Sequence, residues 1–164
     1  MKLISFKQTQ DIKLGAFEDD RIYDLHMLDS NIAENMQDFL QGGESQMQLA
    51  KKAIENGSSN LPIEDVQLIS PVPNPTSVRD AYAFRQHVAT ARKNRGLEMI
   101  PEFDEIPIFY FTNHNAVFGE GDFPVLQRHT EKLDFELECA AVIGKAGRNI
   151  STSDADDHIA GFMI

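Results

Sequence analysis

The chain has 164 residues, of which 41% are hydrophobic, and its 15 basic and 26 acidic side chains give a net charge of −11. This length fits one ordinary domain, or a small domain with part of a second, and the apolar content excludes general disorder. The acidic balance argues against nucleic acid as the main partner, because phosphate binding needs a clustered positive field.

The first 70 residues are expected to form a small domain of strands followed by two short helices. The strands are predicted at 2–6, 12–17 and 21–25. Glu18-Asp19-Asp20 has the length and polarity of a hairpin turn between the last two. One helix is predicted from an N-cap at Ser30 to Gly42-Gly43, and the next ends at Asn56-Gly57.

Three prolines between Ile69 and Pro75 cannot continue a helix or a central strand. We therefore place a domain boundary there, between residues 1–70 and residues 71–164. The second part is predicted to contain a helix from about 80 to 95 and a short helix from Ser153. Its strands are predicted at 106–112, 115–118 and 134–143. The class is mixed α+β and rich in strands.

The ends and the single cysteine suggest where the protein resides. Cys139 cannot form an internal disulfide, which is typical of a reducing compartment. The first residues lack the apolar core and cleavage site of a leader peptide, and there is no apolar run of about 18 residues. We expect a cytoplasmic protein without a membrane segment. Because the chain stops in an apolar run, we also expect Ile164 to be a cut end.

The segment Glu136-Leu137-Glu138 is the first candidate for chemistry. Residues i and i+2 of a strand share one face, so the two carboxylates would lie together, with Asp134 beside them. A solvated acidic face is the simpler interpretation. However, Ala140–Ile143 is apolar on both faces, as in an internal strand, and like charges on a covered face favour a bound cation.

Asp80 and His87 form the second candidate. Seven residues are close to two helical turns, so a helix would return both to one face about 10 Å apart. One could hold a metal while the other handles a water molecule. The alternatives are a charge at a helix N-terminus for Asp80 and a half-buried structural histidine for His87. Ligands that are all carboxylates suit Mg²⁺ or Ca²⁺, with Mn²⁺ possible.

Three ordered segments of the chain resemble the fumarylacetoacetate hydrolase family. They are Arg79–His87, Leu133–Glu138 followed by Val142–Lys145, and His158–Ile164. Together they cover residues 71–164 in the order found in that family. Residues 1–70 are similar only in a loose way to the small N-terminal domain that many members carry.

The resemblance implies roles for individual residues. Asp80, Glu136 and Glu138 correspond to metal ligands and His87 to the general base. Tyr82 and Tyr110 fall where the family contacts substrate, and Arg95, with Arg92 as the alternative, corresponds to the group that binds a substrate carboxylate. The third acidic ligand, in an Asn-Asp pair, and the acid that orients the histidine are expected beyond Ile164.

The resemblance further implies an incomplete mixed β-roll from a homodimeric enzyme. Its expected reaction is metal-dependent hydrolysis of a carbon–carbon bond in a small 1,3-dicarbonyl acid, such as fumarylacetoacetate or an acylpyruvate. The alternatives are a decarboxylase, isomerase or hydratase of a 2-oxo acid, and a non-catalytic metal-binding homologue. We expect residues 1–164 alone to be inactive and to bind metal weakly.

Overall fold

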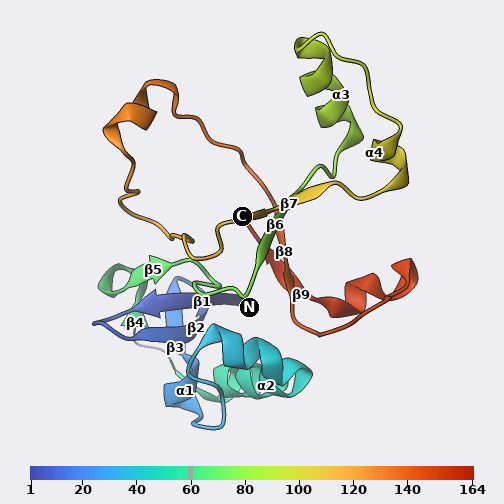
Figure 1. Cartoon of the computed structure of the whole chain (residues 1–164). Helices are drawn as coiled ribbons and strands as arrows, with labels where there is room; N and C mark the ends of the chain where they lie inside the picture. Colours follow the sequence, from blue (N-terminus) through green and yellow to red (C-terminus); the bar gives the residue numbers. More distant parts are fainter. Residues whose placement is uncertain (59–60) are drawn as a thin grey trace. The chain divides into compact units, whose positions relative to one another are not determined.

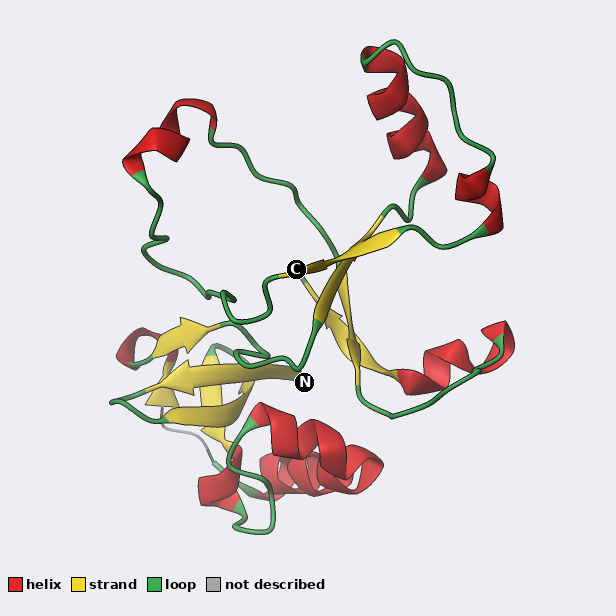
Figure 2. Cartoon of the chain, in the orientation of Figure 1, coloured by secondary structure: helices red, strands yellow, loops and turns green. Residues whose placement is uncertain are grey.

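The computed structural model describes residues 1–58 and 61–164 (Figure 1). The chain divides into two compact units. One comprises Met1–Pro73 with Phe118–Ile164, and the other comprises Asn74–Val117. Helices and strands occur in both units, which confirms the mixed, strand-rich class (Figure 2). The division at residue 70 into two domains stays a prediction.

In its described residues the first unit contains a five-stranded antiparallel sheet of order β4-β3-β2-β1-β5. The strands are β1 (Lys2–Lys7), β2 (Ile12–Glu18), β3 (Arg21–Asp24), β4 (Leu61–Pro62) and β5 (Gln67–Ile69). The three strands predicted for this region are therefore confirmed. Asp19 and Asp20 turn the chain between β2 and β3 with φ of 51° and 59°, the left-handed conformation of tight hairpin turns.

Two helices cover this sheet, α1 (Leu25–Leu28) and α2 (Met36–Asn56). The predicted N-cap at Ser30 is wrong, because α2 begins at Met36 and the side chain of Asn35 accepts from the Asp38 amide. Gly43, with φ of 58°, interrupts α2. The two predicted helices are thus two segments that meet at this glycine. The short helix α1, capped by Asp24, was not predicted.

One apolar cluster holds the sheet and these helices together. Its buried members are Leu14, Ala16, Leu25, Ile32, Met36, Phe39 and Ala50. They come from β2, α1, the loop after α1, and α2, so every layer of residues 1–58 contributes. Burial of such side chains stabilises a fold by roughly 1.5–3 kcal/mol each.

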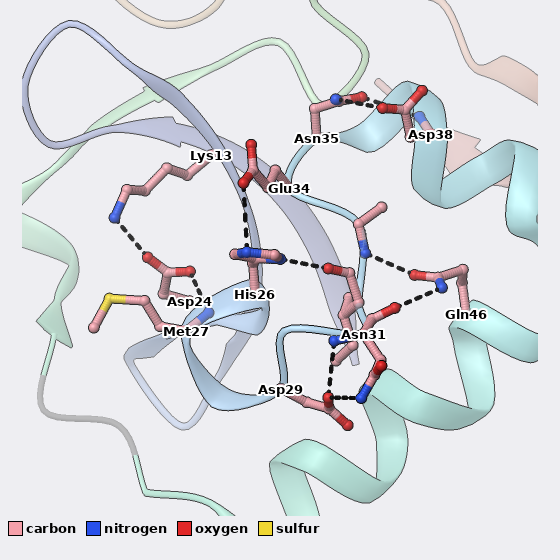
Figure 3. A network of polar contacts seen from close by, with 12 residues as sticks. Lys13, Asp24, His26, Met27, Asp29, Asn31, Glu34, Asn35, Asp38 and Gln46 are labelled. Carbon is pink, nitrogen blue, oxygen red and sulfur yellow. Dashed lines mark hydrogen bonds and ion pairs between the residues drawn. The ribbon is translucent and has the colours of Figure 1, made fainter.

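A polar network ties the loop between α1 and α2 to both helices (Figure 3). The Gln46 side chain accepts from the Ala33 amide at 2.8 Å and donates to the Asn31 carbonyl at 3.0 Å. His26 bonds through Nδ1 to the Ile32 carbonyl at 2.6 Å. His26 therefore has a structural partner that the sequence did not indicate.

Two contacts within the first unit fix the proline-rich connector. The buried hydroxyl of Ser5 in β1 donates to the Pro71 carbonyl at 2.8 Å. The backbone at Gly119 passes so close to that of Ile69 and Ser70 that a Cβ there would overlap the Ile69 Cα. Glycine is therefore required where the chain returns to this unit.

The rest of the first unit contains the strands β8 (Ala140–Ile143) and β9 (Ile159–Met163) and the 3₁₀ helices η2 (Gln127–Lys132) and η3 (Thr152–His158). The predicted strand 134–143 is wrong over 134–139, and the predicted strand 115–118 is wrong. No neighbouring strand pairs with either segment among the described residues, and an isolated strand is not stable in water. The helix predicted from Ser153 is a 3₁₀ helix.

The second unit is a β-hairpin with a helical insertion. It contains β6 (Val78–Ala81), α3 (Arg85–Asn94), α4 (Glu102–Glu105) and β7 (Phe109–Thr112). The predicted helix 80–95 is wrong over its first turn, because Val78–Ala81 pairs with the aromatic strand β7 and Phe84 has extended dihedrals. Asp80 therefore lies on a strand, and the argument from two helical turns fails. Strand 106–112 is confirmed over Phe109–Thr112.

An ion pair joins the start of α3 to α4. The Arg85 guanidinium donates to Asp104 through Nε at 3.0 Å and Nη2 at 3.3 Å. This bidentate bond lowers the pKa of the Asp104 carboxyl and raises the pKa of Arg85. Both side chains are exposed, so the pair orients α3 without burying charge.

Burial differs sharply along the chain. Val88, 4% exposed, is the one buried side chain beyond residue 73 among those described, whereas the core lies in residues 1–73. Every exposed large hydrophobic side chain except Met1 and Met27 lies beyond residue 80. Among the helices in the described ranges, none is long and apolar enough to cross a membrane.

Replacing Gln46 with alanine should lower the free energy of unfolding of the first unit by about 1–2 kcal/mol, because it leaves a loop amide and a loop carbonyl without their partner. Urea denaturation followed by far-UV circular dichroism measures this change. Gln48→Ala is the matched control, since Gln48 donates a hydrogen bond to Glu44 on the same exposed helix face. Equal effects of the two substitutions would contradict the role given to Gln46.

Replacing Arg85 with glutamine should raise the pKa of Asp104 toward its ordinary value of 3.8, because the hydrogen bonds to the carboxylate are lost. Since the pKa is lowered in the folded state, the pair contributes fully above 3.8 and is lost as the pH falls through the folded value. A carboxyl ¹³C NMR titration measures the shift, with Arg79→Gln as the control. An Asp104 titration that is unchanged by Arg85→Gln would show that the pair does not form.

Candidate functional site

Asp80 and Tyr110 are the two candidate residues that the structure joins directly. They are opposite each other in the β6–β7 register, so their side chains lie on the same face of the hairpin. The Tyr110 hydroxyl donates to Oδ2 of Asp80 at 2.7 Å. This bond orients the carboxylate and leaves Oδ1 and further lone pairs as possible metal ligands.

The other face of the hairpin carries a different group of side chains. The Arg79 guanidinium lies over the Phe109 ring at 5.8 Å and over the Phe111 ring at 4.7 Å. These distances are in the range of cation–π contacts, which hold Arg79 against the aromatic face. The hairpin therefore separates an acid–phenol face from a cation–aromatic face. In the sequence, the alternation of phenylalanine with hydroxyl-bearing residues over 109–112 could have indicated these two faces.

His87 lies in the first turn of α3 and is exposed. It lines an open hollow of about 570 Å³ whose walls come from one continuous segment. The lining residues are Ala83, Phe84, Arg85, Gln86, His87 and Thr90. The Arg85–Asp104 pair, which fixes the start of the same helix, therefore also positions His87. Sequence reasoning missed this pair because nothing in the sequence connects residues 19 positions apart.

The candidate substrate contacts differ in how they are held. Tyr82 continues the hairpin, since its amide donates to the Ile108 carbonyl at 3.1 Å, and its side chain is exposed. Arg92 donates through Nε to the Glu98 carbonyl and so holds the turn after α3. Arg95 is the C-cap of that helix, and its exposed side chain extends from the helix end. Of the two arginines, Arg92 has its side chain engaged in a hydrogen bond to the turn, whereas the side chain of Arg95 is exposed.

Glu136 and Glu138 lie before β8 in an exposed segment without strand structure. The strand face predicted for them is therefore not formed in this chain. The apolar residues that alternate with them, Phe135 and Leu137, are exposed as well. The alternating pattern therefore does not correspond to a strand with one buried face. Within the part of the chain that the structure describes, no group of three or more acidic, histidine or cysteine side chains could hold a metal ion.

The chemistry of the candidate ligands nevertheless suits a divalent cation. Asp80, Glu136 and Glu138 each offer carboxylate oxygens as donors. Carboxylate oxygens are the ligands of Mg²⁺, Ca²⁺ and Mn²⁺. The oriented carboxylate of Asp80 is the part of this set that the structure already places in a defined geometry.

Comparison with known proteins relates these observations to a family. The model described as fumarylacetoacetate (FAA) hydrolase C-terminal matches residues 76–164. The mitochondrial oxaloacetate tautomerase fahd2 of Xenopus laevis is 27% identical over 168 residues, which is 100% of this chain and 50% of that protein. The mitochondrial oxaloacetate tautomerase FAHD2A of Homo sapiens is 28% identical over 143 residues, 87% of this chain and 43% of that protein.

Two solved structures share the fold. A putative HpcE protein from Mycobacterium smegmatis has a TM-score of 0.72 at 21% identity, covering 99% of this chain and 53% of that one. Maleylpyruvate hydrolase from Sphingobium sp. SYK-6, solved with manganese(II) and pyruvate, has a TM-score of 0.68 at 21% identity, covering 99% and 56%. The fold is therefore an incomplete mixed β-roll of the fumarylacetoacetate hydrolase type.

The chain spans about half the length of the curated relatives it matches. The family match covers residues 76–164, more than half of the 164 residues, and it contains Asp80, His87, Glu136 and Glu138 in the expected order. The chain belongs to the fumarylacetoacetate hydrolase family.

Proposed function

We propose that this chain is part of a divalent-metal-dependent enzyme that hydrolyses a carbon–carbon bond in a small 1,3-dicarbonyl acid, with His87 as the general base. The observation that carries the proposal is the Asp80–Tyr110 pair, which orients a carboxylate inside the family match. Seven residues further along, an exposed imidazole lines an open hollow. An oriented oxygen ligand and an accessible base are the two groups that such a hydrolysis requires.

In this proposal Asp80, Glu136 and Glu138 hold the cation, which when bound supplies Lewis-acid polarisation of the dicarbonyl oxygens. Mg²⁺, Ca²⁺ and Mn²⁺ all suit these donors, and a structural neighbour was solved with manganese(II). Tyr110 keeps the Asp80 carboxylate in one orientation, so the ligand does not have to be ordered when the cation arrives.

His87 takes a proton from a water molecule, and the resulting hydroxide attacks one carbonyl carbon of the substrate. The bond between that carbon and the central carbon then breaks, and the central carbon leaves as an enolate that is protonated to the second product. The Arg85–Asp104 pair holds the turn of α3 that carries the imidazole. Arg95 binds the substrate carboxylate, and Tyr82 contacts the substrate.

A second candidate is a tautomerase of a 2-oxo acid, because the Xenopus laevis and Homo sapiens relatives are named oxaloacetate tautomerases. His87 would then move a proton between the carbon next to the ketone and the ketone oxygen, which becomes the enol hydroxyl, without water and without cleavage of a carbon–carbon bond. The two reactions share the cation and the base. They differ in whether a water molecule reaches the substrate carbonyl.

The full-length protein that contains this chain should distinguish them when it is supplied with Mn²⁺ or Mg²⁺. Loss of the ultraviolet absorbance of several acylpyruvates, with the two acid products found by chromatography, is expected for the hydrolase. Faster decay of enol-oxaloacetate absorbance with the carbon skeleton intact identifies the tautomerase. Activity on neither substrate would contradict both proposals.

His87→Asn should lower kcat of that protein by about 10²- to 10⁴-fold, the usual contribution of a general base, and change Mn²⁺ affinity by less than about threefold. Steady-state kinetics and Mn²⁺ titration by electron paramagnetic resonance measure the two effects. His129→Asn is the control, since His129 lies in η2, outside the proposed site. A kcat unchanged by His87→Asn would exclude it as the base.

Tyr110→Phe keeps the ring of β7 but removes the donor to Asp80, so Mn²⁺ affinity should fall by about tenfold, as for other groups that orient metal ligands. The Mn²⁺ titration reads this effect without turnover. Tyr82→Phe is the matched substitution, and we expect it to raise KM while leaving Mn²⁺ affinity unchanged. Equal Mn²⁺ affinity in Tyr110→Phe and the unaltered protein would rule out the orienting role.

The homodimer and the cytoplasmic location remain predictions. The relatives named above are described as mitochondrial, which favours neither location for this chain by itself. Sedimentation of the full-length protein would test the dimer, and fractionation of cells that produce it would test the location.

A further inference from the structure

The hollow beside His87 holds a positive charge that the proposed reaction does not yet use. Among the described residues that line the hollow, Arg85 carries the one permanent charge, and the side chains around the imidazole are otherwise uncharged. Arg95 is not one of the lining residues. A small organic acid that approaches His87 therefore meets the Arg85 guanidinium in the same hollow.

The Arg85 guanidinium already binds a carboxylate. It donates to Asp104 through Nε at 3.0 Å and through Nη2 at 3.3 Å. Two parallel bonds from one edge of the guanidinium are the geometry in which arginine binds the carboxylates of ligands as well as those of side chains. This edge of Arg85 is thus a carboxylate site, and its occupant in this structure is a side chain of the protein itself.

Asp104 is an occupant that another carboxylate can replace. The side chain of Arg85 is 58% exposed and that of Asp104 is 55% exposed, and exposed ion pairs are held together weakly. The bonds to Asp104 use two of the five N–H donors of a guanidinium. The other three can bind an incoming carboxylate before Asp104 leaves and returns to water.

The insertion between β6 and β7 has other bonds that hold it when this pair opens (Figure 1). A backbone bond joins its two ends, from the Tyr82 amide to the Ile108 carbonyl at 3.1 Å. Arg92 holds the turn after α3 by donating to the Glu98 carbonyl. An exchange of carboxylates at Arg85 therefore leaves the insertion folded.

We propose that Arg85 binds a carboxylate of the substrate in this hollow, and that Asp104 occupies its place until the substrate enters. The inference rests on the proposed function, since it takes His87 as the base in the same hollow. The exchange conserves charge, because one carboxylate replaces another on the guanidinium. The bidentate bond then fixes the acid group next to the base, which orients the reacting carbon for proton transfer.

This role for Arg85 identifies the substrate as a dicarboxylic acid. The proposed function assigns one substrate carboxylate to Arg95. Arg85 begins α3 and Arg95 is its C-cap, so their backbones are about 15 Å apart along the helix and each takes a carboxylate of its own. A dicarbonyl acid with two carboxylates meets this requirement. An acylpyruvate with an uncharged acyl chain leaves Arg85 bound to Asp104.

Kinetics of the full-length protein with Mn²⁺ distinguish a binding role from a purely structural pair. Arg85→Gln should raise KM for a dicarboxylic substrate, fumarylacetoacetate or oxaloacetate, by about 10- to 100-fold, because charge-assisted hydrogen bonds to the substrate are lost. Asp104→Asn should lower that KM by about two- to fivefold, because the competing carboxylate is removed. With acetylpyruvate, which has one carboxylate, both substitutions should leave KM unchanged.

Two exposed residues provide matched controls. Arg148 lies in the loop after β8, and Glu105 is the neighbour of Asp104 in α4. Neither Arg148→Gln nor Glu105→Gln should change KM. If Arg85→Gln and Asp104→Asn both raise KM, or both lower kcat with KM unchanged, the pair only orients α3 and the proposal is wrong.

A binding measurement without turnover keeps this test apart from the proposed reaction. The metal-free full-length protein is labelled with ¹⁵N-arginine and titrated with malonate at constant ionic strength. Malonate should move the Arg85 Nε–Hε signal, which is identified by its loss in Arg85→Gln, and should do so at lower concentration in Asp104→Asn.

A signal that malonate does not move would overturn the role of Arg85, even in a protein that is active in the acylpyruvate or oxaloacetate assay. A signal that moves in a protein inactive in both assays would support the carboxylate site and contradict only the proposed reaction.

Discussion

A β-strand is stable only when its backbone has a neighbouring strand and its apolar face is covered, and this requirement governs the whole chain. Residues 1–58 satisfy it with β1–β3, two helices and a cluster that includes Leu14, Leu25 and Phe39. Beyond residue 73 the described chain buries one side chain, Val88 of the helix α3, so its paired strands lack such cover. The two isolated hairpins and the segment before β8 all follow from this lack of partners.

The same requirement explains which elements could be predicted. β1, β2 and β3 were found because their pattern and their turn at Asp19-Asp20 are local signals. The N-cap of α2 was misplaced because Ser30 and Asn35 are both good caps, and contacts of Gln46 with the loop decide between them. Residues 134–139 have the alternation of a strand but no strand beside them, and a sequence pattern cannot report that absence.

For the candidate site, the roles of the residues stay predictions, and the structure tests only their geometry. Asp80, His87, Glu136 and Glu138 were identified from their order in the chain, and the family match contains all four. The element that carries Asp80 was wrong, because pairing with β7 overrides the helical pattern. The bond of Asp80 to Tyr110 spans 30 residues. It is a tertiary contact that became visible only with the strand register.

The proposed metal site depends on strand pairing in the segment before β8. Glu136 and Glu138 come directly before β8, so a strand that pairs with an extended β8 would bring them into the same ladder. Their side chains would then share one face, as the i and i+2 positions of a strand require. A cation that binds this face would favour the paired state, and by linkage the pairing strand would raise the affinity for the cation by the same factor. In the proposed function, completing the sheet would therefore be the step that turns two exposed carboxylates into metal ligands.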